Sequence, residues 1–221
     1  MTAGEQQDGR VLQSRRVYDG LRRDISAQRL LPGTVLQEAA LSEQFEASRT
    51  PVREALFRLH QEGFIEKVGR QLRVKAFSLA EVEELYQLRE ALEKMAVRLC
   101  IDRASDASLD EIQAQLERYT EFDVDADYEA FNEYANQFHR SIVALCGNSM
   151  IQAQLAAIYD KVLVINSRYW RVGNTVEDAQ RDHAYILRAI RNRDVVVAEA
   201  ATRAHIQGIV TLYRDTNRTT A

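Results

Sequence analysis

The chain has 221 residues, 46% of them hydrophobic, which suits one large domain or two small ones. No apolar run is long enough to cross a bilayer and there is no signal-peptide core, so we expect a cytoplasmic protein without a membrane partner. The net charge of −4 is uneven: residues 10–75 carry 13 Lys and Arg against 8 Asp and Glu, whereas residues 78–221 carry 16 against 23. This split is typical of a nucleic-acid-binding module joined to a second domain.

The N-terminal end is polar and lacks a periodic pattern, which predicts a disordered tail over residues 1–10. From residue 11, Val17, Leu21 and Ile25 recur four apart and predict a helix over 11–27. Two short helices with a tight turn between them are predicted within 31–63. Apolar residues share one face of each, namely Leu36, Leu41 and Phe45 in the first and Val52, Leu56 and Leu59 in the second.

The start of the second short helix is rich in polar groups. Ser48 is placed to cap it, and Pro51 fits its first turn, where a missing N–H costs nothing. One end of this helix would therefore present free backbone N–H donors, two hydroxyl groups and two guanidinium groups. Such groups suit phosphates and guanine edges, and a helix-turn-helix inserts this part of its second helix into the DNA major groove. We therefore predict DNA contacts from Ser48, Arg49, Thr50 and Arg53.

A hairpin signal follows. Short strands are predicted over 64–68 and 72–75, with Gly69 permitting a positive φ in the turn. In this interpretation Gly69 lets the backbone approach DNA closely and Arg70 enters the minor groove. The alternative is a hairpin that only packs against the helices.

The residues PG-x-x-L, followed by ASRTPVREAL-x-RL-x-x-EG, resemble the winged helix-turn-helix of the GntR family of bacterial transcription regulators. The resemblance covers residues 17–74 and implies a DNA-binding domain over 11–76, with three helices and a β-hairpin wing. Two departures matter. Glu46 and Ala47 stand where the family usually has Gly and an apolar residue, and Gln28 and Arg29 stand where it usually has a Gly. Glu46 adds a negative charge near the DNA face.

A capping box at Ser78-Leu79-Ala80-Glu81 begins the second part of the chain. Pro is absent and Gly scarce beyond it, and apolar residues recur at three and four. The pattern predicts helices over 79–103, 106–120, 126–146, 149–169, 176–191 and 194–214. Residues 77–221 are thus expected to form an all-α antiparallel bundle of about six helices, making the protein mainly α. Cys100 and Cys146 are expected to be buried free thiols.

Three of the four histidines lie on apolar helix faces of this predicted bundle: His139, His183 and His205. A single inward His is usually a hydrogen-bonded core residue. Imidazole is also the commonest metal ligand, and bundle cores often hold metal sites. Periodicity alone leaves both interpretations open. His60, in the first domain, is expected to be structural.

The run NQFHRSIVALCGN, then His183 with AYILRAIRNRD, then His205, resembles the FCD ligand-binding domain of the FadR-like branch of the GntR family. In metal-binding members three His and an Asp or Asn four residues before the first His are the ligands. His139, His183 and His205 match the three His positions. The fourth falls on Ala135, which cannot ligate, with Asn136 one residue on. The resemblance implies a Zn²⁺, Ni²⁺ or Mn²⁺ site with positions open to water or an effector.

The run YQLREALEKMAVRL resembles the start of the same domain. Arg89 stands where family members carry a pocket-facing Arg that helps to hold carboxylate effectors. The alternative is an ion pair with Glu93, four residues on. Arg89 and Asn136 are therefore the candidate effector-binding residues.

The leading hypothesis is a ligand-responsive DNA-binding transcriptional repressor, not an enzyme. It would bind a palindromic operator as a homodimer and sense a small organic acid through its helical domain, with a divalent metal. One alternative is a constitutive DNA-binding protein whose bundle holds a structural metal or core histidines. Another is a three-His metalloenzyme, for which the sequence offers neither HExxH nor a di-iron ExxH pairing.

Overall fold

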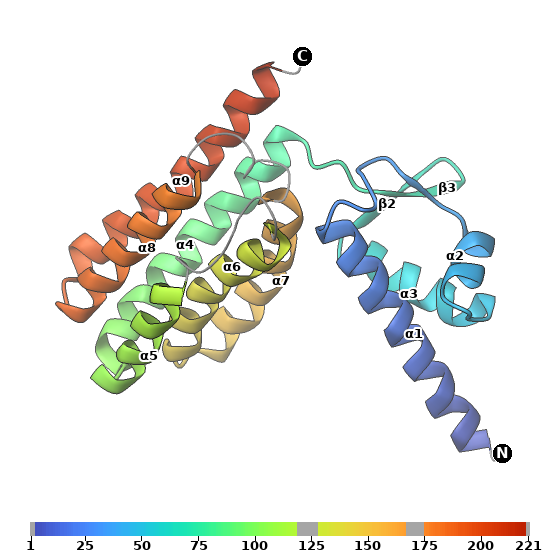
Figure 1. Cartoon of the computed structure of the whole chain (residues 1–221), viewed down its shortest axis with the longest axis horizontal. Coiled ribbons are helices and arrows are strands. Elements are labelled where there is room, and N and C mark those ends of the chain that lie inside the picture. The colour runs from blue at the N-terminus through green and yellow to red at the C-terminus, as the bar shows by residue number, and fades with distance from the viewer. Residues whose placement is uncertain (1–2, 119–127, 167–174, 220–221) are drawn as a thin grey trace. The chain divides into compact units, whose positions relative to one another are not determined.

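The computed structural model describes residues 3–118, 128–166 and 175–219 (Figure 1). The chain divides into two compact units, residues 1–76 and 77–221. Each unit has its own buried core. The predicted mainly helical fold, with a winged helix-turn-helix followed by a helical bundle, is confirmed.

The described part of the first unit holds three helices and three short strands: α1 (Ala3–Ser26), β1 (Val35–Leu36), α2 (Glu38–Gln44), α3 (Arg49–Gln61), β2 (Ile65–Val68) and β3 (Gln71–Val74). Because α1 begins at Ala3, the prediction of a disordered tail over residues 1–10 is wrong from residue 3 onward. Apolar periodicity indicates a buried helix face, so a helix without a buried face shows no such pattern. The Glu and Gln residues at this end are nevertheless good helix formers.

The position of Leu36 also differs from the prediction, because this residue lies in strand β1 and α2 begins only at Glu38. The sheet is antiparallel with the order β1-β3-β2. Leu36 pairs with Leu72, and Ile65 pairs with Val74. A strand of two residues is too short to show the alternation of apolar and polar residues typical of strands, so the spacing of Leu36 and Leu41 was interpreted as helical.

Helices α1 and α3 run parallel and share the core of the first unit. Arg10 pairs with Glu54, and the Tyr18 hydroxyl donates to Glu62, each eight residues further along its helix. The side chains between the helices are almost fully buried: Val17, Leu21, Ile25, Val52, Leu56 and Leu59. This packing holds one face of α3 inward and so turns its opposite face to solvent.

The described part of the second unit holds six helices: α4 (Leu79–Arg103), α5 (Asp106–Glu117), α6 (Tyr128–Leu145), α7 (Ser149–Asn166), α8 (Thr175–Arg191) and α9 (Val195–Thr219). The capping box is confirmed, because Ser78 and Glu81 exchange both backbone-to-side-chain bonds. Ion pairs of Glu83 with Arg214 and of Arg98 with Glu199 show that α4 and α9 are antiparallel. Predicted helical residues at 119–120, 126–127 and 167–169 lie outside the described residues.

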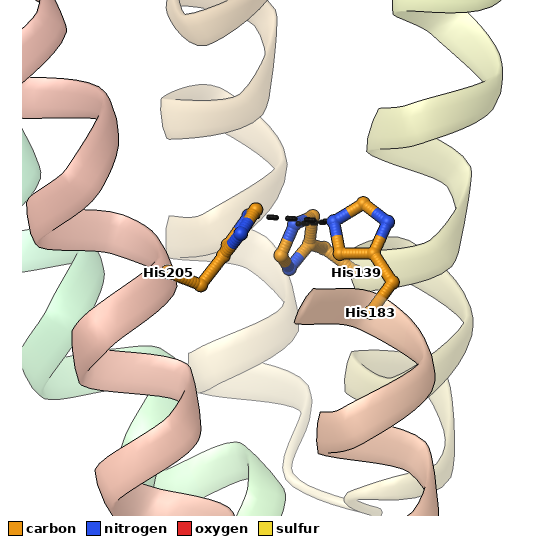
Figure 2. Close-up of side chains that lie close together, drawn as sticks. All are labelled: His139, His183 and His205. Atoms are coloured by element: carbon orange, nitrogen blue, oxygen red, sulfur yellow. Dashed lines mark hydrogen bonds between the residues drawn. The ribbon is translucent and has the colours of Figure 1, made fainter. Parts of the chain in front are cut away.

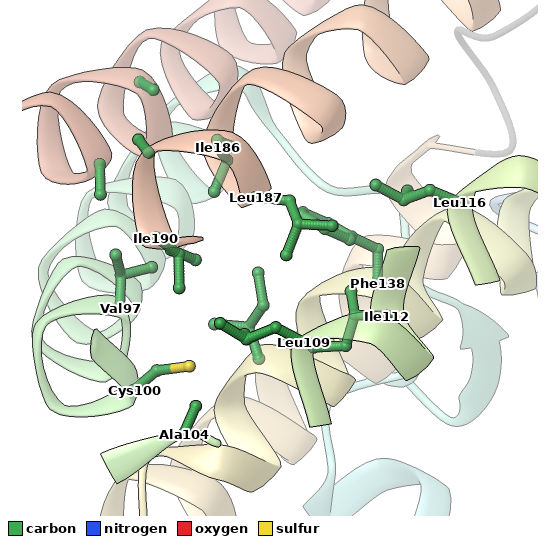
Figure 3. Close-up of a cluster of buried hydrophobic side chains, with 14 of the residues drawn as sticks. Val97, Cys100, Ala104, Leu109, Ile112, Leu116, Phe138, Ile186, Leu187 and Ile190 are labelled. Atoms are coloured by element: carbon green, nitrogen blue, oxygen red, sulfur yellow. The ribbon is translucent and has the colours of Figure 1, made fainter. Parts of the chain in front are cut away.

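One core cluster of the bundle lies among α4, α5, α6, α8 and α9 (Figure 3). Its members include Val97, Leu109, Phe138, Leu187 and Ile190. Cys100 and Cys146 are buried free thiols, as predicted. A second cluster brings α7 into the bundle through Leu155, Tyr159 and Val162. No helix in the described residues is long and apolar enough to cross a membrane.

Candidate DNA interface and three-histidine site

The four predicted DNA-contacting residues at the start of α3 are all exposed: Ser48, Arg49, Thr50 and Arg53. Pro51 and Val52, between them, are buried and anchor this turn to the core. Ser48 is the N-cap residue by its extended backbone, but its side chain makes no capping hydrogen bond, so that part of the prediction is wrong. The exposed Ser48 side chain thus leaves the first-turn N–H groups without a capping partner, which suits a phosphate ligand.

Arg53 differs from Arg49 in having a partner. Its Nε lies 2.7 Å from Oε2 of Glu38, the first residue of α2. Sequence reasoning missed this contact, because Glu38 and Arg53 lie on different helices and share no periodic pattern.

The hairpin loop between β2 and β3 consists of Gly69 and Arg70, since Val68 pairs with Gln71. Gly69 has φ +62° and open space around its α-carbon. Arg70 is exposed at the tip. The hairpin lies where it was predicted, although Gln71 belongs to β3 rather than to the loop, and the left-handed first residue of the turn explains the glycine.

The two departures from the family pattern fall on strained backbone. Gln28 has φ +55° and Glu46 has φ +47°. Glu46 lies in the turn between α2 and α3, and its side chain is exposed three residues before α3 begins at Arg49. A glycine would adopt this left-handed conformation without steric cost.

The three predicted metal ligands come together in the second unit (Figure 2). His139 on α6, His183 on α8 and His205 on α9 are each no more than 5% exposed. The Nε2 atom of His183 lies 3.1 Å from Nε2 of His139 and 3.3 Å from Nε2 of His205. One ligand atom from each residue lies within 4.8 Å of the others. Three helices therefore present imidazole nitrogens to one point.

Two carboxylates hold the outer nitrogens of this cluster. Glu93 accepts from Nδ1 of His139 at 3.0 Å, and Asp182 accepts from Nδ1 of His205 at 3.2 Å. A proton kept on Nδ1 leaves the Nε2 lone pair of each ring pointing inward, which is the arrangement that orients metal-bound histidines. Sequence reasoning missed Asp182, because it precedes His183 in the chain but serves His205 on another helix.

Burial keeps the imidazoles of His139 and His183 neutral. It lowers the pKa of His139 to about 4, although Glu93 acts in the opposite direction, and it holds the pKa of His183 well below its usual range. Neutral rings offer nitrogen lone pairs at neutral pH, and lone pairs that point toward one another suit a bound cation. Ligand bonds of about 2.0–2.1 Å at tetrahedral angles would place the nitrogens about 3.3–3.4 Å apart, close to the distances of His183 Nε2 from Nε2 of the other two rings. The residues present therefore fit a divalent metal.

Arg89 lies next to this cluster in an ion pair, the alternative considered for it. Its Nε donates to Oε1 of Glu93 at 2.6 Å, and both residues are almost fully buried. Although burial opposes charge on both, their attraction keeps the pKa of Arg89 above, and that of Glu93 below, its ordinary value. The Nη1 atom of Arg89 is buried without a hydrogen-bond partner. One guanidinium donor is thus left to face a further acceptor.

A cavity of about 10 Å³ is lined by Arg89 and the three histidines, with Ala135 and Asn136 also in its wall. Such a space holds an ion or one water molecule. The amide of Asn136 donates to the Asn132 carbonyl at 3.3 Å. A larger pocket of about 390 Å³, within the range of small-molecule sites, shares Asn166, His205 and Ile209 with this cavity.

Comparison with known proteins gives two family matches. The model of bacterial regulatory proteins of the gntR family matches residues 13–71, and that of the FCD domain matches residues 84–208. The HTH-type transcriptional repressor RspR of Escherichia coli (strain K12) is 27% identical over 199 residues, covering 89% of this chain and 86% of that protein. A regulator from Streptomyces ambofaciens, named for an unstable DNA locus, is 30% identical over 200 residues, covering 88% and 82%.

A solved structure, E. coli McbR/YncC, has the same fold. It matches with a TM-score of 0.77 at 22% identity and covers 92% of this chain and 98% of that one.

Proposed function

Because the chain belongs to the GntR family of bacterial transcription regulators and carries the FCD domain, we propose that it is an effector-responsive repressor with a metal in its helical unit. Family membership makes the protein a transcription regulator and not an enzyme. Repression is favoured because RspR, among its relatives, is named a repressor. In this proposal the first unit binds operator DNA and the second unit changes the affinity of that binding.

The observation that carries the metal part of the proposal is the convergence of the Nε2 atoms of His139, His183 and His205. Zn²⁺, Ni²⁺ and Mn²⁺ are the candidate ions, and three protein ligands leave open positions for another molecule. When bound, such an ion supplies a Lewis acid that attracts an anionic oxygen. Ala135 provides no fourth ligand, which increases the room for an effector.

The buried, unpartnered Nη1 of Arg89 supports a carboxylate as the effector. Arg89 and the three histidines line the same small cavity, so an anionic ligand of the ion would lie beside the guanidinium. Asn136 lines this cavity as well. The larger pocket, which has His205 in its wall, offers room for the remainder of a small organic acid.

A homodimer on a palindromic operator completes the proposal. Helix α4 carries a stripe at alternating spacings of three and four: Leu85, Leu88, Leu92, Met95 and Leu99. Leu88 and Met95 are 50% and 46% exposed, although the other members pack on the core of the bundle. An exposed apolar pair seven residues apart on one helix suits a self-complementary contact with a second copy.

The DNA part is tested by gel shift with a duplex that the wild-type protein selects from random sequence. Arg49→Ala and Arg53→Ala should each weaken specific binding about tenfold or more, the order of one lost base contact, and leave the melting transition of the helical unit unchanged. Unchanged gel shifts in both variants would contradict this placement of the reading helix.

The sensing part is tested by thermal melting with candidate carboxylates, in the presence and absence of ZnCl₂, NiCl₂ or MnCl₂. A true effector raises the melting temperature with occupancy and changes operator affinity in the same concentration range. If no acid does either, the alternative holds, in which DNA is bound constitutively and the histidines form a structural metal site or part of the core.

A further inference from the structure

Arg49 and Arg53 lie one helical turn apart on the exposed face of α3, but only the Arg53 side chain is held by a partner. The Nε atom of Arg53 is held 2.7 Å from Oε2 of Glu38, and the two side chains are 64% and 36% exposed. Arg49 makes no hydrogen bond or ion pair with any described residue. One guanidinium is therefore held in a set orientation, and the other is not.

The contact with Glu38 leaves the terminal nitrogens of the Arg53 guanidinium available for other hydrogen bonds. A guanidinium has five N–H donors in one plane, and Glu38 engages only the one on Nε. The two terminal nitrogens remain available for the paired bonds that arginine makes with N7 and O6 of guanine. Because the group is planar, fixing its inner edge also fixes the plane in which the outer donors lie.

We propose that Glu38 is a positioning residue for base recognition, which holds Arg53 toward a guanine edge and away from the phosphates. The proposal rests on the DNA-reading role given above to the first turns of α3. Glu38 is the first residue of α2, where the helix dipole favours a carboxylate, so it is held by a helix end rather than by a loop.

Electrostatics gives Glu38 a second effect on specificity. A mobile arginine near DNA is drawn to phosphates, and such contacts strengthen binding to every sequence. The carboxylate of Glu38 attracts Arg53 and repels phosphate, so it disfavours that alternative. Specificity is a difference between affinities and increases when the wrong contact is made less favourable.

The test compares base preferences selected from a random duplex library by the full-length protein and its variants. Arg53→Ala should relax the preference at one base pair in each half-site. Glu38→Gln should relax the same base pair and leave unchanged the one that Arg49→Ala relaxes. The ratio of specific to non-specific affinity should fall about tenfold in Glu38→Gln, the order of one lost base contact. Affinity for a shuffled duplex should be unchanged or increased.

Two further variants separate orientation from charge. Glu43→Gln changes the charge by the same amount on an exposed residue of the same helix, and it should leave the base preference unaltered. Glu38→Asp keeps the charge at the start of α2 but shortens the side chain by one methylene, and it should lose part of the preference. Melting temperatures of all variants establish that each one is folded.

The outcomes distinguish the two levels of the argument. If Arg53→Ala changes the preferred sequence but Glu38→Gln does not, the positioning role is refuted and the DNA-reading role of α3 stands. If Glu38→Gln lowers specific and non-specific affinity equally, Glu38 acts through the fold and the proposal is wrong. If Arg53→Ala also leaves the preference intact, the placement of the reading helix fails together with the inference.

Discussion

The Nε2 atoms of His139 and His183 lie 3.1 Å apart, although the residues are 44 positions apart in the chain and belong to different helices. Glu93 accepts a hydrogen bond from the far side of the His139 ring, which leaves the inward nitrogen as a lone-pair donor. His205 is held in the same way by Asp182. Inward lone pairs on neighbouring rings repel each other unless a proton or a cation lies between them, and the cluster is therefore poised for a cation.

The first prediction concerns this cluster. His183→Ala should remove bound divalent metal, because His183 is the ring whose Nε2 contacts both others. Elemental analysis of purified protein should give about one metal per wild-type chain and little in the variant, and the rise in melting temperature with added ZnCl₂ should be lost. His60→Ala, in the first unit, is the matched control. An unchanged metal content in His183→Ala would exclude the site.

The second prediction concerns the buried Arg89–Glu93 pair. Arg89→Ala should destabilise the helical unit by about 3–5 kcal/mol, because it leaves the Glu93 carboxylate buried without its main partner. The double variant Arg89→Met with Glu93→Leu should recover most of that loss, since apolar residues of similar volume often replace a buried pair at little cost. Urea unfolding measures both.

The double variant also separates stability from sensing. If Arg89 holds the effector, the recovered protein should still bind operator DNA but should not respond to any carboxylate that releases the wild-type protein. A normal response in the double variant would assign recognition of the acid to other groups.

The sequence predicted the histidine cluster because each ring lies on the buried face of its own helix, and burial is what helical periodicity reports. The ion pair of Glu93 with Arg89 could be considered from the sequence because the two residues lie four positions apart within α4. Asp182 and Glu38 were missed because each serves a residue on another helix, and spacing along one helix contains no information about its neighbour. The strand β1 was missed because two residues form no pattern.

Backbone conformation was the other feature that the sequence did not predict. Gln28 and Glu46 were noted as departures from a family pattern that favours glycine, but only the structure shows both in left-handed backbone. The capping bond assigned to Ser48 illustrates the converse, because the backbone has the N-cap form and the side chain does not use it. Residue type thus predicted the position of the helix end and not its hydrogen bond.

The third prediction concerns the α4 stripe. Leu88→Glu or Met95→Glu should convert a dimer into monomers, because either variant places a charge in the middle of the proposed apolar contact. Analytical ultracentrifugation measures the change, and Val196→Glu is a control on another exposed apolar residue of the same unit. Wild-type protein that sediments as a monomer would remove the stripe as the dimer contact.

The last prediction concerns Glu46, which combines strained backbone with a negative charge beside the recognition helix. Glu46→Gly should stabilise the first unit by about 1 kcal/mol, because glycine adopts positive φ without the clash of a side chain. It should also increase affinity for any duplex at low salt, because one carboxylate near the phosphates is removed.

Two companion variants separate these effects. Gln28→Gly relieves backbone strain without a change of charge, so it should raise the melting temperature and leave DNA affinity unchanged. Glu46→Ala removes the charge but keeps a side chain in the left-handed conformation, so it should increase affinity with little gain in stability. Thermal melting and salt-dependent gel shifts report the two quantities independently. If Glu46→Gly and Glu46→Ala both bind DNA like the wild type, the Glu46 charge does not reach the phosphates, and the turn affects stability alone.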